Sequence, residues 1–375
     1  MKHESVFGVL AVGLLAVAVG CNTGSNSENG GAKGGGANSG VSAKPPVFSL
    51  AWSEYPSWSV FGVAHEMGLL DGAEGKQGSV EKEWGVDIVL QEASYDSCLN
   101  AFTTRNYDAV CMTNMDALIV SPNRDGVAFL PTSTSNGADA CIVVGINNLD
   151  ELKPHKIYGL EATVSQYCFV RCIEEIEKQE GKGYQASEFQ FTNQDPAIAT
   201  AAMTQRQETH QAIMVWNPFV IQTQRERPDA KVLFDSSKIP GEIVDMVVVG
   251  RDVLERDGAD LFTAAVIDTF YRMNEALDEP GTGDQALVAL GEKFSNLSLA
   301  DMKIVVEQTQ FYKTPDEAIA LLESDEFKQT MKTVEHFCVE QGLVSEPKFG
   351  FGKETGRQLL FDPSHIKAMQ KLKAP

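Results

Sequence analysis

The sequence is short of positive charge. Lysine and arginine together number 31, against 52 aspartate and glutamate residues, so the formal net charge at pH 7 is −21. An excess of acidic groups on this scale repels phosphate backbones and anionic headgroups. We therefore expect no nucleic-acid partner and no binding of the folded chain to anionic lipid through its charge.

Histidine and the common catalytic motifs are also scarce. The six histidines form no H-x-x-x-H pair and do not lie beside cysteines at the spacing of metal ligands. The chain contains no G-x-S-x-G nucleophile elbow, no Walker phosphate loop and no dinucleotide-binding fingerprint. The sequence therefore predicts no metal site, no cofactor and no catalytic residues, and it favours a binding protein over an enzyme.

The few cysteines follow no disulfide or metal pattern. No two of them form a C-x-x-C pair, and most lie in apolar stretches. Cys168 and Cys172 would share one face of a helix, where the geometry is poor for a disulfide within that helix. We interpret the six cysteines after Cys21 as buried free thiols, although an exported protein could also pair them. These six are Cys98, Cys111, Cys141, Cys168, Cys172 and Cys338.

The apolar run that could relate to a membrane lies at the start of the chain. Val6–Val19 is apolar but too short to span a bilayer comfortably, which is typical of the core of a signal peptide. The run ends in Ala18-Val19-Gly20-Cys21, which resembles a bacterial lipobox. We expect residues 1–20 to be a lipoprotein signal peptide and Cys21 to carry lipid. An ordinary signal peptide or an uncleaved anchor is the alternative.

A tether is predicted to follow the lipid-bearing cysteine, so that residues 21–46 form one segment. Its glycine, serine and asparagine content, as in Gly30–Gly36, cannot bury a core and is typical of a flexible linker. Such a spacer lets a folded domain move away from a membrane surface. We therefore expect the mature chain to be extracytoplasmic and lipid-anchored to a bacterial membrane on its periplasmic side.

From residue 47 onward, short apolar strands alternate with helices. The order at the start is strand, loop, helix, strand, helix, strand, helix, which predicts an α/β fold with a parallel sheet covered by helices. About 330 residues remain after the tether, a length that suits two lobes better than one core. We expect one lobe from residues 47–150 plus 246–375, a second from 151–245, and a ligand cleft between them.

Polar side chains collect where the predicted strands end. In Cys111–Leu118, for example, a buried strand turns directly into a helix. Carboxyl ends of strands and amino ends of helices are where open α/β sheets hold small ligands. The predicted ligand contacts are Trp52, Ser53, Tyr55, Trp58, Asp96, Thr113, Asn114, Asp116, Ser135, Asn136, Ser165, Trp216, Asn217, Glu242 and Asp245.

Each of these residues also has a purely structural interpretation. Asp116 follows Thr113 by three residues and fits a capping box in which aspartate replaces glutamate. Asp96 and Ser165 could cap helices and do nothing else. The tryptophans could belong to the core or wedge two elements apart. The joint pattern of aromatic walls with a few polar groups is what points to a small-molecule pocket.

The charge of the predicted contacts narrows the class of ligand that the site could bind. Asp96, Asp116, Glu242 and Asp245 are acidic, and these loops carry little arginine or lysine. Carboxylates beside aromatic faces suit a small cation, and guanidinium fits well because it donates a fork of N–H groups and stacks on rings. Urea is equally compatible with the acid count, but its carbonyl oxygen would need an N–H donor such as Asn114.

Several segments resemble a known family. The sequence is similar to the periplasmic substrate-binding proteins of ABC importers associated with urea carboxylase, within the wider nitrate, sulfonate, taurine and bicarbonate group. The likeness covers most of residues 47–365, and Phe234–Met246 is its most specific part. The matching segments are Cys111–Leu118, Val215–Pro218, Phe234–Met246 and Phe311–Ala318.

The resemblance implies a type II periplasmic-binding fold that captures a solute, urea or a guanidine-like compound, for an ABC permease and its ATPase. It implies lobe closure without chemistry, and we expect a monomer. Three alternatives stay open. The chain could bind an oxyanion such as taurine, a sulfonate or nitrate at helix amino ends. It could be an enzyme of the same fold, as pyrimidine-synthase relatives are, or a sensory lipoprotein that presents its closed form to a receptor.

Overall fold

The computed structural model describes residues 44–293 and 297–374. The predicted signal peptide, Cys21 and the tether before residue 44 lie outside the described residues. The described part belongs to one unit of the chain, Lys44–Pro375. Within it, no helix is both long and apolar enough to cross a membrane.

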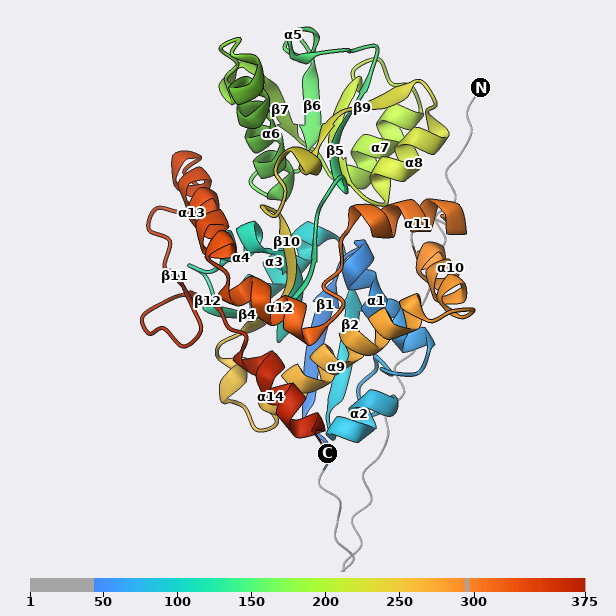
Figure 1. The fold of residues 1–375 in the computed structure, drawn as a ribbon, viewed down its shortest axis with the longest axis vertical. Helices are drawn as coiled ribbons and strands as arrows, with labels where there is room; N and C mark the ends of the chain where they lie inside the picture. The colour runs from blue at the N-terminus through green and yellow to red at the C-terminus, as the bar shows by residue number, and fades with distance from the viewer. Residues whose placement is uncertain (1–43, 294–296, 375) are drawn as a thin grey trace, which may run out of the picture. The chain divides into compact units, whose positions relative to one another are not determined.

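Two mixed sheets organise this unit, and Figure 1 shows them one above the other. The seven-stranded sheet has the order β11-β12-β4-β10-β3-β1-β2, and we call this sheet with its helices lobe 1. Its strands are β1 (Val47–Trp52), β2 (Asp87–Glu92), β3 (Ala109–Thr113), β4 (Gly126–Thr134), β10 (Val244–Gly250), β11 (Phe349–Phe351) and β12 (Leu359–Phe361).

The five-stranded sheet, with its helices, is lobe 2. Its order is β7-β6-β8-β5-β9. Its strands are β5 (Asp139–Val144), β6 (Lys156–Gly159), β7 (Gln190–Asn193), β8 (Ala212–Trp216) and β9 (Ala230–Asp235). The predicted α/β class is confirmed, but neither sheet is purely parallel: β10 runs antiparallel to β3 and β4, and β5 runs antiparallel to β8 and β9.

The antiparallel strands are the two that begin at the junction of the lobes. The first crossing is residues 135–138, between β4 and β5, and the second is residues 236–243, which includes the short turn η2 (Ser236–Lys238) before β10. The sequence prediction placed residues 139–150 in lobe 1, and this was wrong. Strand β5 pairs with β8 and β9, so the chain crosses before Asp139 and not near residue 151.

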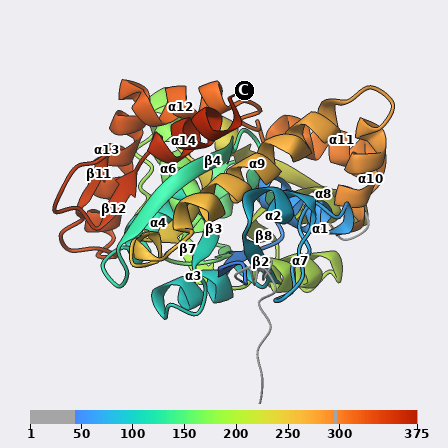
Figure 2. The same ribbon diagram turned by 90° about the horizontal axis from the view of Figure 1, so that it is seen from below.

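Helices cover both sheets. Figure 2, seen from below, shows α9 lying across the seven-stranded sheet with α14 close by. The helices of lobe 1 are α1 (Pro56–Glu66), α2 (Ser79–Trp84), α3 (Tyr95–Thr103), α4 (Asn114–Val120), α9 (Ala259–Asp278), α10 (Gly283–Lys293), α11 (Leu299–Gln308), α12 (Pro315–Glu323), α13 (Asp325–Glu340) and α14 (Ser364–Lys373), with the short turn η3 (Val253–Glu255). Those of lobe 2 are α5 (Leu149–Leu152), α6 (Val164–Glu180), α7 (Pro196–Thr204) and α8 (Phe219–Glu226), with the short turn η1 (Ala186–Glu188).

The cores follow from the apolar runs in the sequence. Every residue of β3, β8 and β10 is buried, as expected for central strands covered on both faces. The six cysteines after Cys21 are all buried and free, which agrees with their interpretation as structural thiols. Burial of the strands fixes their register, and register decides which side chains meet where the two lobes face each other.

Candidate functional site

The strand ends of both lobes bring carboxylates to the junction. In lobe 1, Asp245 of β10 lies opposite Thr113 of β3 and Ser133 of β4. In lobe 2, Asp139 of β5 lies opposite Trp216 at the end of β8. The two aspartates are 1% and 3% exposed, so both are withdrawn from water.

These side chains line a small cavity between the lobes, which we call the inner cavity. Its free volume is about 10 Å³, enough for roughly the centre of one water molecule. A larger ligand therefore requires the walls to move apart. The inner cavity is lined by Tyr55, Trp58, Tyr95, Thr113, Asp139, Val164, Trp216, Ile243 and Asp245.

Four aromatic rings form much of its wall. The ring centroids of Tyr55 and Trp58 are 4.8 Å apart, those of Trp58 and Tyr95 5.5 Å, and those of Tyr95 and Trp216 5.7 Å. Pro56 begins α1, which places Tyr55 at the N-cap and Trp58 in the first turn. The local sequence at this helix start thus sets two of the four rings.

Asp245 is held by a chain of hydroxyl groups. Ser133 Oγ donates to Asp245 Oδ2 at 2.5 Å and contacts Ser57 Oγ at 2.8 Å, and Ser57 Oγ contacts Thr132 Oγ1 at 2.9 Å. Burial raises the pKa of Asp245 well above its usual value; the Ser133 bond lowers it, and the negative charge of Asp139 raises it further. This environment therefore favours the protonated acid.

Asp139 stands on the lobe 2 side of the same cavity. Ser135 Oγ donates to Asp139 Oδ2 at 2.6 Å and contacts Ser236 Oγ at 2.7 Å, so both crossing segments support this carboxyl group. Burial raises the pKa of Asp139 to about 7, the Ser135 bond works against this shift, and the charge of Asp116 adds to it. This group therefore titrates near neutral pH.

Asp116 lies behind the wall and does not line the inner cavity. Its Oδ2 accepts bonds from Tyr95 Oη at 2.6 Å and Thr113 Oγ1 at 2.8 Å, whereas its Oδ1 has no partner among the described residues. Thr113 Oγ1 also accepts from the Asp116 backbone N–H at 3.2 Å, so Thr113 is the N-cap of α4. Burial raises the pKa of Asp116 to about 6. The structure thus supports the capping interpretation, with Asp116 also holding two lining side chains in place.

The predicted contacts divide by position. Five of them, Tyr55, Trp58, Thr113, Trp216 and Asp245, line the inner cavity. Asp116 and Ser135 bond to lining side chains. Ser53 and Asp96 line a separate cavity on the other side of Tyr95.

Two predicted contacts have structural roles that occupy their polar atoms. Asn114 donates from Nδ2 to the carbonyl of Glu242 at 3.1 Å and accepts at Oδ1 from the N–H of Val244 at 3.0 Å. Glu242 forms two bonds with Arg171, at 2.8 and 2.9 Å, and accepts from Tyr167 Oη at 2.7 Å. Both residues hold the second crossing segment in place and do not line the inner cavity; sequence spacing does not show which partner a polar atom has.

The remaining predicted contacts also lie off the inner cavity. Trp52 packs against Gly62, where an added Cβ would lie 2.7 Å from the indole ring, so it belongs to the core. Asn217 Nδ2 donates to Gln308 Oε1 at 2.8 Å. Asn136 meets Gln308 through its backbone N–H, and Ser165 is buried at the start of α6 without lining the inner cavity.

Sequence reasoning missed four lining residues: Tyr95, Asp139, Val164 and Ile243. Asp139 is the most consequential of them. It heads the apolar strand β5 much as Asp245 stands near the start of β10. The sequence signal that could have identified Asp139 is a carboxylate near the start of each strand that follows a crossing between the lobes. It was not recognised because β5 was assigned to lobe 1.

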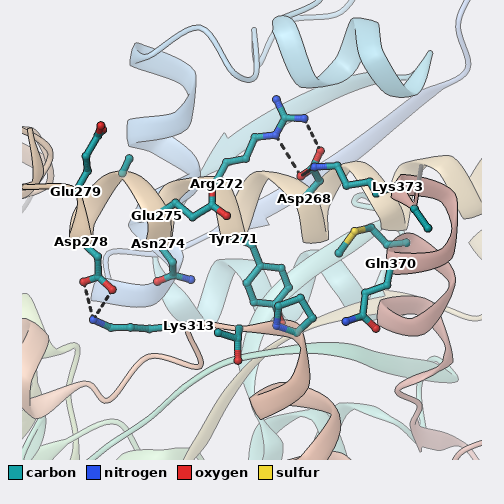
Figure 3. Close-up of a pocket in the computed structure, with 15 residues that line it drawn as sticks. Asp268, Tyr271, Arg272, Asn274, Glu275, Asp278, Glu279, Lys313, Gln370 and Lys373 are labelled. Atoms are coloured by element: carbon teal, nitrogen blue, oxygen red, sulfur yellow. Dashed lines mark hydrogen bonds and ion pairs between the residues drawn. The ribbon is translucent and has the colours of Figure 1, made fainter.

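A larger groove lies wholly within lobe 1, between α9, the start of α12 and α14 (Figure 3). Its volume is about 1350 Å³, but its charges are largely paired. Lys313 Nζ lies 2.6 Å from Asp278 Oδ1, and Asp268 binds both Arg272, at 2.9 Å, and Lys373. The inner cavity, with buried acids and no lining cation in the part of the chain described, is the stronger candidate site.

Comparisons with known proteins bear on the fold. No protein-family model and no curated protein matched the chain. Among solved structures, the periplasmic aliphatic sulphonate binding protein SsuA from Escherichia coli matches with a TM-score of 0.62 at 17% identity, covering 81% of this chain and 90% of that one. The periplasmic nitrate-binding protein NrtA from Synechocystis PCC 6803 matches with a TM-score of 0.60 at 10% identity, covering 88% and 90%.

A third match names the architecture. A Candida albicans gene product described as having the generic periplasmic binding protein structural fold matches with a TM-score of 0.57 at 13% identity, covering 87% of this chain and 95% of that one. At identities this low the likeness shows the fold alone. The two sheets, their mixed α/β topology and these matches together show that the chain has the periplasmic-binding-protein fold.

Proposed function

We propose that this chain is the extracytoplasmic solute-binding protein of an ABC importer and that it captures a small, N–H-rich organic cation, with guanidinium as the model ligand. The fold, the binding proteins among the structural matches and the segments that resemble urea carboxylase-associated binding proteins support the binding role. In this role no bond is made or broken. The lobes close on the solute, and the closed form presents it to a permease and its ATPase.

The charge of the inner cavity is the main reason to expect a cationic ligand. Asp139 and Asp245 face it, and none of its nine described lining residues is lysine, arginine or histidine. A buried carboxylate without a counter-charge is costly, so without a cation the site favours neutral acids. A cation would supply the missing charge, and the rings of Trp58 and Trp216 would add cation–π attraction. A nitrate or sulfonate group would instead meet two carboxyl groups.

Urea is the second candidate, and one feature favours it. The indole Nε1–H groups of Trp58 and Trp216 are buried without a partner among the described residues. A carbonyl oxygen could accept from them, and guanidinium has no comparable acceptor. The two ligands are separated by charge, since only the cation must compete with protons for Asp139 and Asp245.

Lobe closure is consistent with contacts that span the junction. The N–H of Val164 in lobe 2 lies 3.4 Å from Asp116 Oδ2 in lobe 1, and Asn217 of lobe 2 bonds Gln308 of α11 at 2.8 Å. The inner cavity has room for about one water molecule. Entry of guanidinium therefore requires the lobes to separate about the two crossing segments.

Calorimetry with guanidinium chloride, urea, nitrate and taurine at about pH 5.5 and about pH 8 tests the proposal. Guanidinium should bind, and more tightly at the higher pH, because each proton it displaces changes the affinity by up to about tenfold per pH unit. Binding of urea should lack this rise. Binding of the anions alone, strengthening at low pH, would overturn the assignment.

The N-terminal segment would anchor the protein to a membrane. Lipid on Cys21 would hold the chain at a bacterial membrane, and the segment to residue 46 would let the binding unit move beside the permease. Replacing Cys21 by serine should move the protein from the membrane fraction to the soluble fraction of a bacterial host. An unchanged distribution would refute the lipid anchor while leaving the ligand assignment intact.

A further inference from the structure

A second cavity is lined by residues of both lobes and shares two of them with the inner cavity. Tyr95 and Trp216 line both cavities, and their ring centroids are 5.7 Å apart in an edge-to-face contact. The second cavity, which we call the outer cavity, has a volume of about 580 Å³. The two rings therefore form a common wall between it and the inner cavity.

Carboxylates from both lobes converge on the outer cavity. In lobe 1, Glu54 lies in the loop after β1, Glu92 ends β2 and Asp96 lies in the first turn of α3; in lobe 2, Asp195 is the N-cap of α7. No lysine, arginine or histidine is among its lining residues within the described chain. The like charges of the two lobes would repel each other across the cavity, so a cation placed between them would stabilise this arrangement.

A buried polar group with unused hydrogen-bonding capacity gives an independent reason to expect a ligand. Ser53 lines the outer cavity and is 4% exposed, and its Oγ has no partner among the described residues. Buried polar groups are usually satisfied, so Ser53 Oγ needs either water or a ligand.

We propose that the outer cavity is a second binding site for a small organic cation, occupied on the way to the inner cavity. The proposal rests on the proposed function only in that the same cation is taken to fill both sites. The aromatic wall offers a cation–π face to the outer side, and the carboxylates raise the local cation concentration. Because Glu92 and Asp96 are exposed, binding there is weak and sensitive to salt.

The test is a ¹⁵N–¹H NMR titration of the full chain with guanidinium chloride at low salt. Backbone amides of Glu92, Ala93 and Ser94 report the outer cavity, and the indole N–H of Trp58 reports the inner one. Concentrations stay below about 0.1 M, where guanidinium costs little stability. Wild-type protein should show a saturable response from both sets, with different midpoints.

Two variants test binding at the inner cavity and at the outer cavity separately. Asp245→Asn should weaken the Trp58 response and leave the outer midpoint within about twofold, since Asp245 does not line the outer cavity. The triple variant Glu92→Gln, Asp96→Asn and Asp195→Asn should raise the outer midpoint about tenfold. Asparagine can still cap α7 at position 195. Glu255→Gln, on the exposed turn η3, removes one carboxylate elsewhere and should change neither midpoint.

The outcomes are distinguishable. A response at Glu92–Ser94 without one at Trp58 keeps the outer site and refutes guanidinium as the inner ligand. A response at Trp58 without one at Glu92–Ser94 refutes the outer site and keeps the proposed function. An outer midpoint in the triple variant equal to that of Glu255→Gln would also overturn the outer site.

Discussion

At the scale of single residues, the buried carboxyl group of Asp139 makes the stability of the unliganded protein depend on pH. Burial raises its pKa to about 7 in the folded chain, above the usual value for aspartate. Between about pH 4 and pH 7 the folded state therefore holds a proton that the unfolded chain has lost, and the free energy of unfolding decreases as pH rises, by about 1.4 kcal/mol per pH unit for one such group. Asp139→Asn should flatten this decline in the unliganded protein.

Melting temperatures of the unliganded wild type and Asp139→Asn between about pH 5 and about pH 7.5 check this. The exposed Glu255→Gln variant is the control and should keep the wild-type slope. Identical slopes in Asp139→Asn and wild type would show that Asp139 is not protonated in the unliganded folded protein.

Asp116 and Asp245 are both buried aspartates, but their substitution should change ligand affinity by different amounts. Asp245 lines the inner cavity, whereas Asp116 acts through Tyr95 and Thr113. Asp245→Asn removes a charge that faces the ligand and should raise the guanidinium Kd by about 10- to 100-fold at about pH 8. Asp116→Asn should raise it by less than about tenfold, because Asp116 acts on the ligand only through Tyr95 and Thr113. Calorimetry measures both Kd values, and a larger loss of affinity in Asp116→Asn would show direct ligand contact.

At the scale of elements, α11 joins the two lobes. Gln308, the last residue of this lobe 1 helix, accepts from Asn217 Nδ2 of lobe 2 at 2.8 Å and from the N–H of Asn136 at 2.8 Å through its carbonyl. Gln308→Ala keeps the backbone bond and removes the side-chain bond to Asn217. It should favour the open form and raise the guanidinium Kd by about 2- to 12-fold, as expected for one neutral hydrogen bond.

The effect of Gln308→Ala should be independent of pH, because no titratable group is removed. Calorimetry at about pH 5.5 and about pH 8 should therefore give the same ratio of Kd values to wild type. A ratio that changes with pH would mean that the variant disturbs Asp139 or Asp245 and does not simply loosen the lobes.

The positions of individual strands were predicted from the sequence more accurately than the pairing between strands was. Apolar runs located β1, β3 and β10 because their length and their bounding polar residues are local features. The lobe that β5 joins depends on pairing with β8 and β9, far along the chain, and no local pattern carries that information. Strands such as β11, with three residues, are too short for any periodicity to show.

The same distinction holds for the site. Tyr55, Trp58 and Thr113 were predicted because helix starts and strand ends can be recognised locally. The ion pair of Glu242 with Arg171 could not be foreseen, because Arg171 is 71 positions away in the sequence. The expectation of a cationic ligand does not depend on Glu242, since Asp139 is an acid at the cavity wall.

At the scale of the whole molecule, the two lobes should respond to pH as a pair of opposed charges. Asp245 belongs to lobe 1 and Asp139 to lobe 2, and the charge of Asp139 raises the pKa of Asp245. When both are ionised they repel each other across a buried cavity, and separation of the lobes relieves that repulsion. The unliganded protein should therefore be more open at about pH 8 than at about pH 5, and guanidinium should close it at the higher pH.

Small-angle X-ray scattering measures this opening as the radius of gyration. Wild-type protein should expand from about pH 5 to about pH 8 and contract again with saturating guanidinium, whereas urea, being neutral, should offset less of the repulsion. Asp139→Asn removes one of the opposed charges, so its unliganded radius should no longer depend on pH. A wild-type radius that is the same at both pH values would show that the carboxyl groups do not govern closure, and the closed form would then depend on contacts such as Asn217–Gln308 alone.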